Sequence, residues 1–215
     1  MIDATDFTIP GTGVLRNKLG ITDPAVLSRA ATDATAFRLA ELHASPVRGG
    51  FDSTHLQAIH HHIYQDLYDW AGELRPIDAG NVPASQVEKS INSVLDRLSR
   101  ENHLKGLSGE EWARTASAYI YELGTIQPFL AGNQIALQEF AVELARKNNL
   151  SLQWDTTPDI DSDSIALLSQ AEQSANLRRL IMLAMNTDPV AQLSSADYLM
   201  EQGVERFLPI GSSRF

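Results

Sequence analysis

The chain has 215 residues, of which 17 are basic and 27 are acidic, so its formal net charge is -10. This balance argues against a protein that grips a nucleic-acid backbone, because such binding relies on Lys and Arg to neutralise phosphates. The sequence has no cysteine, which excludes disulfides and thiolate chemistry.

The first half of the chain reads as an irregular arm followed by helices. Residues 1–22 are rich in Gly, Thr and Pro, and Asp23-Pro24 opens the first helix with a capping side chain and an early proline. Pro46 and the glycine pair at 49–50 end it. Apolar residues at helical spacing predict that one face of this helix is buried: Leu27, Ala30, Ala31, Ala34, Phe37, Leu39, Ala40 and Leu42.

A second helix is predicted from Asp52 or Ser53 through Trp70, with Ala71-Gly72 as its break. Its apolar residues recur every three or four positions: Leu56, Ile59, Ile63, Leu67 and Trp70. Residues 73–84 contain Pro and Gly-Asn between apolar positions, which predicts a short β-hairpin flap instead of a helix.

Helices fill most of the remaining chain. One begins at Ser85, and the next begins at the capping box of residues 108–111 and runs to about Gly124. After a loop at 125–131, Gly132-Asn133 leads into a helix that ends at 148–149. Residues 151–158 are expected to be extended or loop. Further helices are predicted at 161–173, 175–186 and 188–203, so the fold class is all-α, with one domain over 1–186 and a helical extension over 187–215.

No apolar stretch approaches the roughly 20 residues that a membrane span requires, and the N-terminus lacks the basic-then-apolar pattern of a signal peptide. We therefore expect a cytoplasmic protein that acts on neither nucleic acid nor membrane. Secretion into a target cell by a route that reads no N-terminal signal is left open.

The loop before the helix at Asn133 could bind an anion. The amino end of a helix presents unpaired N–H groups, and Gly132 would let a phosphate approach the backbone closely. Taken alone, however, Gly132-Asn133 is more simply explained as a turn and helix cap.

Several separated stretches resemble the Fic (filamentation induced by cAMP) family. The first is the loop itself, Gln127-Pro128-Phe129-Leu130-Ala131-Gly132-Asn133-Gln134, which is similar to the family motif His-Pro-Phe-x-x-Gly-Asn-Gly-Arg-x-x-Arg. The others are the arm at 16–23, the segment from Phe51 to Arg75 with its specific run at 68–75, and the region after Trp154. The resemblance covers about residues 12–186 and implies a Fic-type helical bundle with a short β-hairpin flap.

The same resemblance implies that the groups for nucleotide transfer are missing. Gln127 stands at the position of the family's catalytic His, and an amide cannot accept a proton at neutral pH. Ala131 replaces the acidic residue that holds Mg²⁺, and Ile135 and Gln138 replace the two arginines. We therefore predict no catalytic residue, no metal and no cofactor. The remnant of the motif, and of any anion site, is Pro128, Phe129, Gly132, Asn133 and Gln134.

Two other stretches are candidate sites. His60-His61-His62 cannot converge on one metal ion, because consecutive helical side chains point about 100° apart. In the Fic family the flap clamps an extended segment of the target, so an unpaired edge here could bind a peptide without catalysis. The candidates for that role are Arg75, Ile77, Asp78, Asn81 and Val82; the alternative is a surface hairpin with no binding role.

We therefore expect an inactive relative of protein adenylyltransferases that binds a protein partner, as a regulator or inhibitor of a toxin or as a secretion or conjugation component. Nucleotide binding is expected to be weak. The alternative is a divergent nucleotidyl- or other group transferase that modifies a protein and uses other acidic groups, such as Glu122, Glu139 or Asp78.

Overall fold

The computed structural model describes residues 4–79, 81–153, 178 and 181–182, and these residues form a helical protein. The α-helices are α1 (Pro24–Ala44), α2 (Ser53–Tyr64), α3 (Val87–Arg100), α4 (Gly109–Ile126) and α5 (Asn133–Lys147), with short 3₁₀ turns at Ala4–Phe7, Ala84–Gln86 and Asn102–Leu104. Within these residues there is no β-sheet, and two isolated bridges join Thr8 to Leu15 and Ala79 to Val82. The predicted all-α class is confirmed.

The chain divides into two compact units. The first comprises Met1–His103 and Glu122–Leu144, and the second comprises Leu104–Tyr121 and Ala145–Phe215. The loop at 127–132 and everything that contacts it in the following sections belong to the first unit. The predicted boundary at 186/187 and the predicted helices at 161–173 and 188–203 lie outside the described residues, as does nearly all of 175–186.

Capping side chains fix the helix starts as the sequence predicted. Asp23 accepts a hydrogen bond from the backbone N–H of Val26 at 2.9 Å, and Asp52 does the same for His55 at 2.9 Å. At the start of α4, the Glu111 carboxylate accepts from the hydroxyl of Ser108 at 2.8 Å and from its backbone N–H, which completes the capping box.

Helix α2 is shorter than predicted. It ends at Tyr64, and the backbone N–H groups of Leu67 and Tyr68 both donate to the Tyr64 carbonyl as the chain turns. Leu67 and Trp70 are nevertheless buried. Their spacing therefore predicted correctly that they are buried, but it predicted wrongly that they lie in a helix. Consecutive tight turns can bring the same residues into the core.

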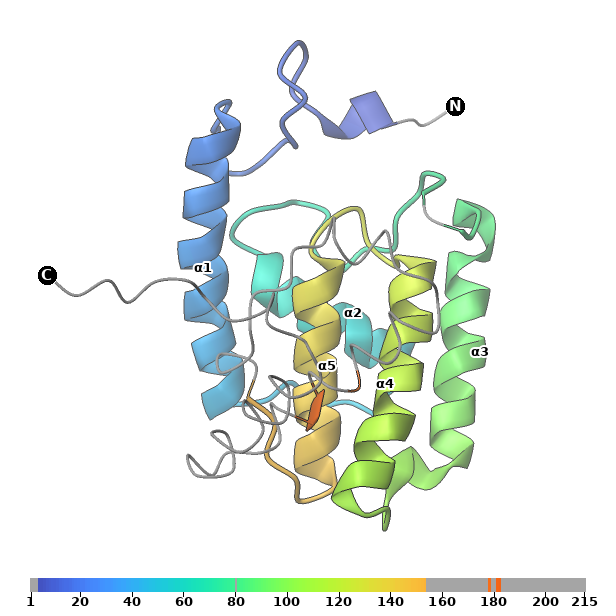
Figure 1. The fold of residues 1–215 in the computed structure, drawn as a ribbon. Coiled ribbons are helices and arrows are strands. Elements are labelled where there is room, and N and C mark those ends of the chain that lie inside the picture. The colour runs from blue at the N-terminus through green and yellow to red at the C-terminus, as the bar shows by residue number, and fades with distance from the viewer. Residues whose placement is uncertain (1–3, 80, 154–177, 179–180, 183–215) are drawn as a thin grey trace, which may run out of the picture. The chain divides into compact units, whose positions relative to one another are not determined.

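The predicted buried face of α1 is also wrong in part. Only Leu27, Thr35 and Leu42 are buried, whereas the side chain of Phe37 is 61% exposed. Helix α1 packs against α2, and α2 packs against α3. Figure 1 shows α1 at the edge of these helices, so much of its surface points away from them.

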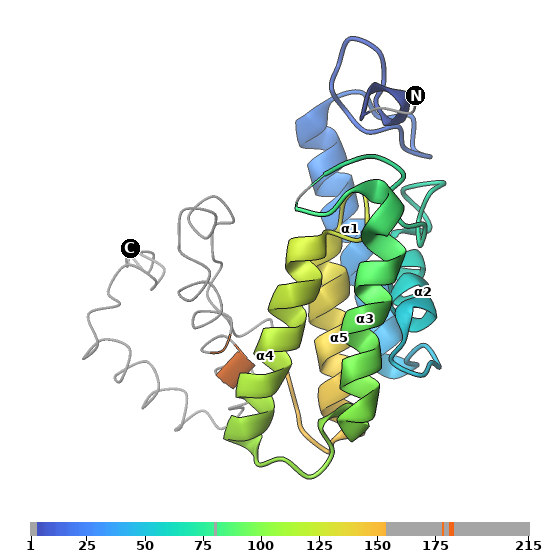
Figure 2. The same ribbon diagram turned by 90° about the vertical axis from the view of Figure 1, so that its right-hand side faces the viewer.

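The core of the first unit is built from buried side chains of α2, α3 and the first part of α5, and Figure 2 shows α2 beside α3. Its fully buried side chains include Leu56, Ile59, Ile63, Ile91, Leu98 and Phe140. Helix α5 also buries two carboxylates: Glu139 lies 3.0 Å from Nε2 of His43, and Glu143 lies 2.9 Å from Nε2 of His55. Each buried acid thus has a histidine partner from an earlier element, as burial of a charge requires.

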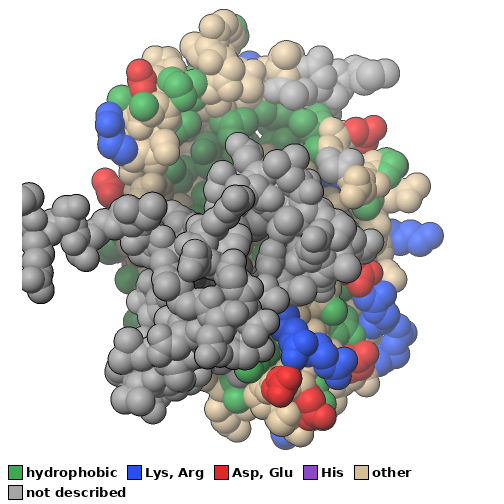
Figure 3. Space-filling model, in the orientation of Figure 1, with side chains coloured by type: hydrophobic (Ala, Val, Ile, Leu, Met, Phe, Trp, Pro, Cys, Tyr) green, Lys and Arg blue, Asp and Glu red, His purple; other side chains and the backbone are tan. Residues whose placement is uncertain are grey.

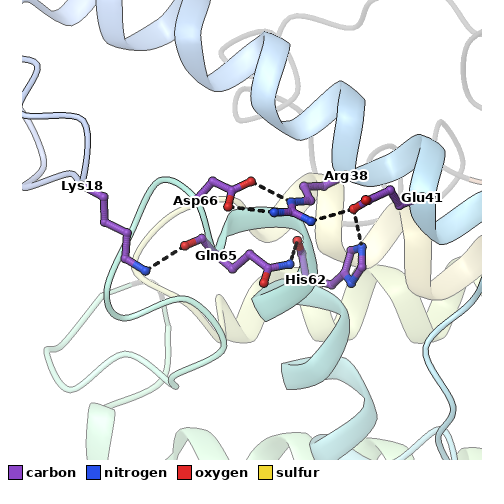
Figure 4. Close-up of polar contacts among 6 residues, drawn as sticks. All are labelled: Lys18, Arg38, Glu41, His62, Gln65 and Asp66. Carbon is purple, nitrogen blue, oxygen red and sulfur yellow. Dashed lines mark hydrogen bonds and ion pairs between the residues drawn. The ribbon is translucent and has the colours of Figure 1, made fainter.

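A surface network connects the N-terminal arm, α1 and the turn after α2 (Figure 4). Arg38 makes a two-pronged contact with Asp66, at 2.7 and 2.8 Å, and a third contact with Glu41 at 2.7 Å. The Arg38 guanidinium therefore holds the pKa of Asp66 below its usual range. Lys18 of the arm donates to the Gln65 carbonyl at 2.8 Å. Because these groups are exposed or only half-buried, the network orients the segments more than it stabilises them.

The described surface in Figure 3 shows acidic and basic side chains interspersed with apolar ones, in keeping with the modest charged fraction of the sequence. Within the described helices, none has the length and apolar character that crossing a bilayer would require.

Candidate functional site

The loop that carries the motif remnant connects α4 to α5 and lies between the segments that follow α2 (Figure 1). Gln127 directly follows α4 and lies in the left-handed region at φ 50°, and Gly132 has φ 75°. The side chain of Gln127 is exposed, whereas Phe129 is buried with 1% of its surface exposed. The loop therefore presents Gln127 outward and anchors itself in the core through Phe129.

Asn133 closes this loop with its own side chain. Its Oδ1 accepts from the backbone N–H of Phe129 at 2.9 Å, and its Nδ2 donates to the Phe129 carbonyl at 2.9 Å. The amide thus supplies both a donor and an acceptor to one backbone unit. Asn133, which the sequence predicts as part of a remnant anion site, uses its side chain to fix the conformation of the loop.

His60 of α2 holds the loop from inside. Its Nδ1 accepts from the backbone N–H of Gly72 at 2.9 Å, and because that position is an acceptor, Nε2 carries the proton and donates to the Ala131 carbonyl at 3.0 Å. The ring stacks on Phe129 with centroids 3.8 Å apart. Burial lowers the pKa of His60 to about 4, so the imidazole is neutral at pH 7.

Tyr64, one turn further along α2, packs against Gly132. A Cβ added to Gly132 would lie 2.3 Å from the Tyr64 ring, and the positive φ already disfavours other residues there. Burial raises the pKa of the Tyr64 hydroxyl above its usual range. Position 132 therefore needs glycine for two independent reasons, neither of which involves a ligand.

Arg75 joins the flap to the loop. Its guanidinium donates to the carbonyls of Gln127 at 2.7 Å and Ile126 at 3.1 Å, and also to those of Ile77 and Val82 across the flap. Its backbone N–H donates to the Pro128 carbonyl at 2.9 Å. Only 2% of its surface is exposed, and burial lowers its pKa. Arg75 was predicted as a peptide-binding side chain, but it is committed to the interior.

Comparison with known proteins agrees with this arrangement. The model of the Fic/DOC family matches residues 50–142. A probable protein adenylyltransferase Fic from Escherichia coli is 32% identical over 184 residues, which cover 83% of this chain and 88% of the relative. The chain belongs to the Fic/DOC family.

The protein adenylyltransferase VbhT of Bartonella schoenbuchensis is 36% identical over 154 residues, which are 69% of this chain but only 32% of VbhT. Solved Fic structures share the fold at lower identity. The type IV secretion system effector protein BepA superposes with a TM-score of 0.77 at 18% identity, covering 98% of this chain and 77% of BepA. BepC of Bartonella tribocorum, solved with bound AMPPNP, gives 0.73 at 22%, covering 82% of this chain and 94% of that one.

The predicted β-hairpin of the flap is not confirmed. Within the described residues, it contains one isolated bridge, between Ala79 and Val82. Asp78 accepts from the backbone N–H of Ala84 at 2.7 Å, which holds the flap against the start of the following helix. Ile77 and Val82 are half-buried, and Asn81 is exposed. Of the predicted flap candidates, Asn81 and Asp78 are the side chains that face solvent.

The acidic residues considered for an alternative mechanism are all engaged elsewhere. Glu122 forms an ion pair with Arg97 of α3, Glu139 is buried against His43, and Asp78 caps the flap. Gln134 is exposed on the first turn of α5. The structure therefore brings Gln127 and Gln134 to the surface, and each of these three carboxylates is engaged with another group.

The three consecutive histidines point in three directions, as their helical spacing predicts. His60 faces the loop, His61 is exposed, and His62 lies 3.4 Å from Glu41 of α1. Within the described part of the chain, no group of three His, Asp or Glu side chains is placed to hold a metal ion.

Sequence reasoning missed the residues that hold the loop from behind. His60 and Tyr64 occupy the same face of α2 one turn apart, a spacing that indicates burial but not what is contacted. Arg75 is an arginine within an apolar flap sequence, and this pattern alone does not distinguish a binding role from a buried structural role. Only the fold shows that all three converge on residues 126–132.

Proposed function

We propose that this chain is a Fic-fold protein that no longer transfers nucleotides and that acts by binding another protein. The observation that carries the proposal is the lack of a usable proton acceptor at the loop. Gln127, at the position of the family's catalytic His, has no basic group. His60 has an imidazole, but it is buried and neutral, and both of its nitrogens are hydrogen-bonded to backbone.

The residues present also do not fit the magnesium ion that nucleotide transfer uses in this family. Ala131, at the position of the metal ligand, has no oxygen in its side chain. Ile135 and Gln138 bring no charge to stabilise a phosphate. Loss of a general base alone costs about 10²–10⁴-fold in rate, and loss of the electrostatic partners removes the main stabilisation of phosphoryl transfer.

The scaffold around the loop supports a binding role. Asn133, Tyr64, Gly132 and Arg75 still hold the loop and flap in one conformation, so the face keeps its shape without its chemistry. Rigid surfaces bind partners at a lower entropic cost. The secretion-effector names of the structural neighbours favour a partner in a toxin, secretion or conjugation system. On this proposal the protein acts in the cytoplasm or in a target cell.

Two assays test the proposal. The purified chain is incubated with α-labelled ATP, Mg²⁺ and a cell extract, beside an active adenylyltransferase relative; we expect no labelled protein above background. Labelling at a rate comparable to that of the relative contradicts the proposal. Co-purification with the protein encoded beside it is expected to yield a complex, which Asn81→Arg on the exposed flap weakens and Glu88→Arg on α3 does not.

The alternative, a divergent transferase, needs an acid or base that is not already engaged. The three candidates from the sequence are all committed, to Arg97, to His43 and to the flap backbone. Calorimetry against nucleotides and nucleotide sugars separates the two functions. Binding at micromolar concentration favours the transferase, and no heat at millimolar ligand favours the binding protein.

A further inference from the structure

Helix α1 exposes a stripe that the fold of its own unit does not use. Val26 is 41% exposed and Phe37 is 61% exposed, and the two are three turns apart on one side of the helix. Between and beyond them the same side carries small or short side chains, namely Ala30, Asp33, Ala40 and Ala44. We define these six residues as the α1 stripe.

Two opposite charges stand at one edge of this stripe. Arg29 and Asp33 are exposed and one turn apart, and neither takes part in an ion pair or hydrogen bond with the described residues. An Arg that precedes an Asp by four positions is in the less favourable order for pairing within one helix. The pair is therefore available to a partner that offers the same two charges in reverse order.

We infer that the α1 stripe is a self-association surface on which α1 of a second copy of this chain packs antiparallel. A two-fold axis across the helix places the same edge of both stripes together, so Arg29 meets Asp33 of the other copy and Asp33 meets its Arg29. The small residue Ala30 lies near the axis and lets the helices approach closely, and Phe37 packs over the turn that carries Val26 in the other copy. The arrangement is isologous: both copies use the same residues.

The stripe is a small interface. Pairing Arg29 with Asp33 makes the two helices overlap over residues 24–38, a length of about 22 Å, and one helix face of that length falls at the low end of specific interfaces, below about 1,200 Å² in total. The dimer is therefore expected to be weak, with a Kd on the order of 10 µM or above. This surface shares no residue with the loop at 127–132, so its test is independent of the proposed function.

Sedimentation velocity from about 1 to 200 µM spans that range of affinity. We expect wild-type chain to shift from monomer to dimer, and Phe37→Asp to remain monomeric. Arg29→Asp or Asp33→Arg alone should weaken the dimer at least about tenfold, because each places like charges opposite one another twice. The exchange Arg29→Asp/Asp33→Arg should restore it. Leu107→Asp, at an exposed apolar residue outside the stripe, is the matched control and should dimerise normally.

The orientation is tested separately, using the absence of cysteine in the chain. A short bis-maleimide should link Ala30→Cys to its copy, because residue 30 lies near the two-fold axis. It should not link Ala44→Cys, whose copies lie about 39 Å apart along antiparallel helices. Wild-type chain that stays monomeric at 200 µM overturns the inference. So does a dimer that survives both Phe37→Asp and the single charge reversals, or equal linkage at both cysteines; unchanged circular dichroism of Phe37→Asp excludes unfolding as the cause of a monomer.

Discussion

The motif loop and helix α1 differ in how their sequence relates to their surroundings. The loop carries Gln127 where the family motif has His, yet its turns are held by the buried side chains of His60, Tyr64 and Arg75 and by its own half-buried Asn133. Helix α1 reads as apolar along much of its length, yet it buries only Leu27, Thr35 and Leu42. Residues retained from a family motif can thus fix the conformation of a loop, and apolar residues of a helix can lie at the protein surface.

The largest effect that separates the two regions is expected at Arg75. Replacing Arg75 by Ala leaves four carbonyls at the loop and flap without their donor, and we expect a loss of about 4 kcal/mol in the free energy of unfolding. Urea unfolding measures it. Arg75→Lys should recover little, because an ammonium cannot reproduce the planar fork. A loss below about 1 kcal/mol would show that the loop is not held by this residue.

Acid should loosen the loop through His60. Its pKa is lowered to about 4 in the folded protein, from 6.5 in the unfolded chain, so the unfolded state binds the proton more readily. The stabilisation is complete above pH 6.5 and is lost as pH falls from 6.5 to 4, by about 3 kcal/mol. Unfolding followed between pH 7 and 4 tests this. His60→Gln should flatten the slope, and His61→Gln, at an exposed neighbour, should leave it unchanged.

Gly132→Ala should cost about 2–3 kcal/mol, because it adds a clash with Tyr64 to an unfavourable positive φ. Gly13→Ala provides the matched control: φ there is 68° with no atom within 4 Å of the added Cβ, so only the backbone cost of about 1 kcal/mol remains. Equal losses at the two positions would show that Tyr64 does not constrain the loop.

The smallest effect is expected on α1. Phe37→Ala should change the unfolding free energy by less than about 0.5 kcal/mol when measured at 1 µM, where the chain is monomeric. Leu42→Ala on the same helix removes a fully buried side chain and should cost about 2–5 kcal/mol. A large loss at Phe37 in the monomer would mean that the ring packs within its own chain.

The sequence predicted the helices well where local signals decide them. Asp23, Asp52 and the pair Ser108 and Glu111 mark helix starts through side chains that cap the adjacent backbone. It predicted the end of α2 poorly, because Leu67 and Trp70 are buried by turns and spacing does not distinguish these from helix. The short-hairpin prediction is not confirmed beyond the bridge at Ala79 and Val82.

The candidate site could be located but not explained from sequence. The prediction that the loop at 125–131 leads through Gly132-Asn133 into a helix is confirmed by the start of α5 at Asn133. The supports of that loop come from residues more than 50 positions away, and their burial depends on long-range packing that a single sequence does not encode locally. Phe37 is a further example. Its helical spacing predicted that it is buried, but the helix that packs against α1 lies on another side of α1.

The central claim is that the chemistry of the loop has been lost while its scaffold remains. Restoring the family residues together, as Gln127→His/Ala131→Glu/Gln134→Gly/Ile135→Arg/Gln138→Arg, tests it most directly by transfer of labelled AMP to protein. We expect no transfer by the wild-type chain or by Gln127→His alone, and measurable transfer by the variant that carries all five substitutions. Substantial transfer by the wild-type chain, or by Gln127→His alone, would contradict it.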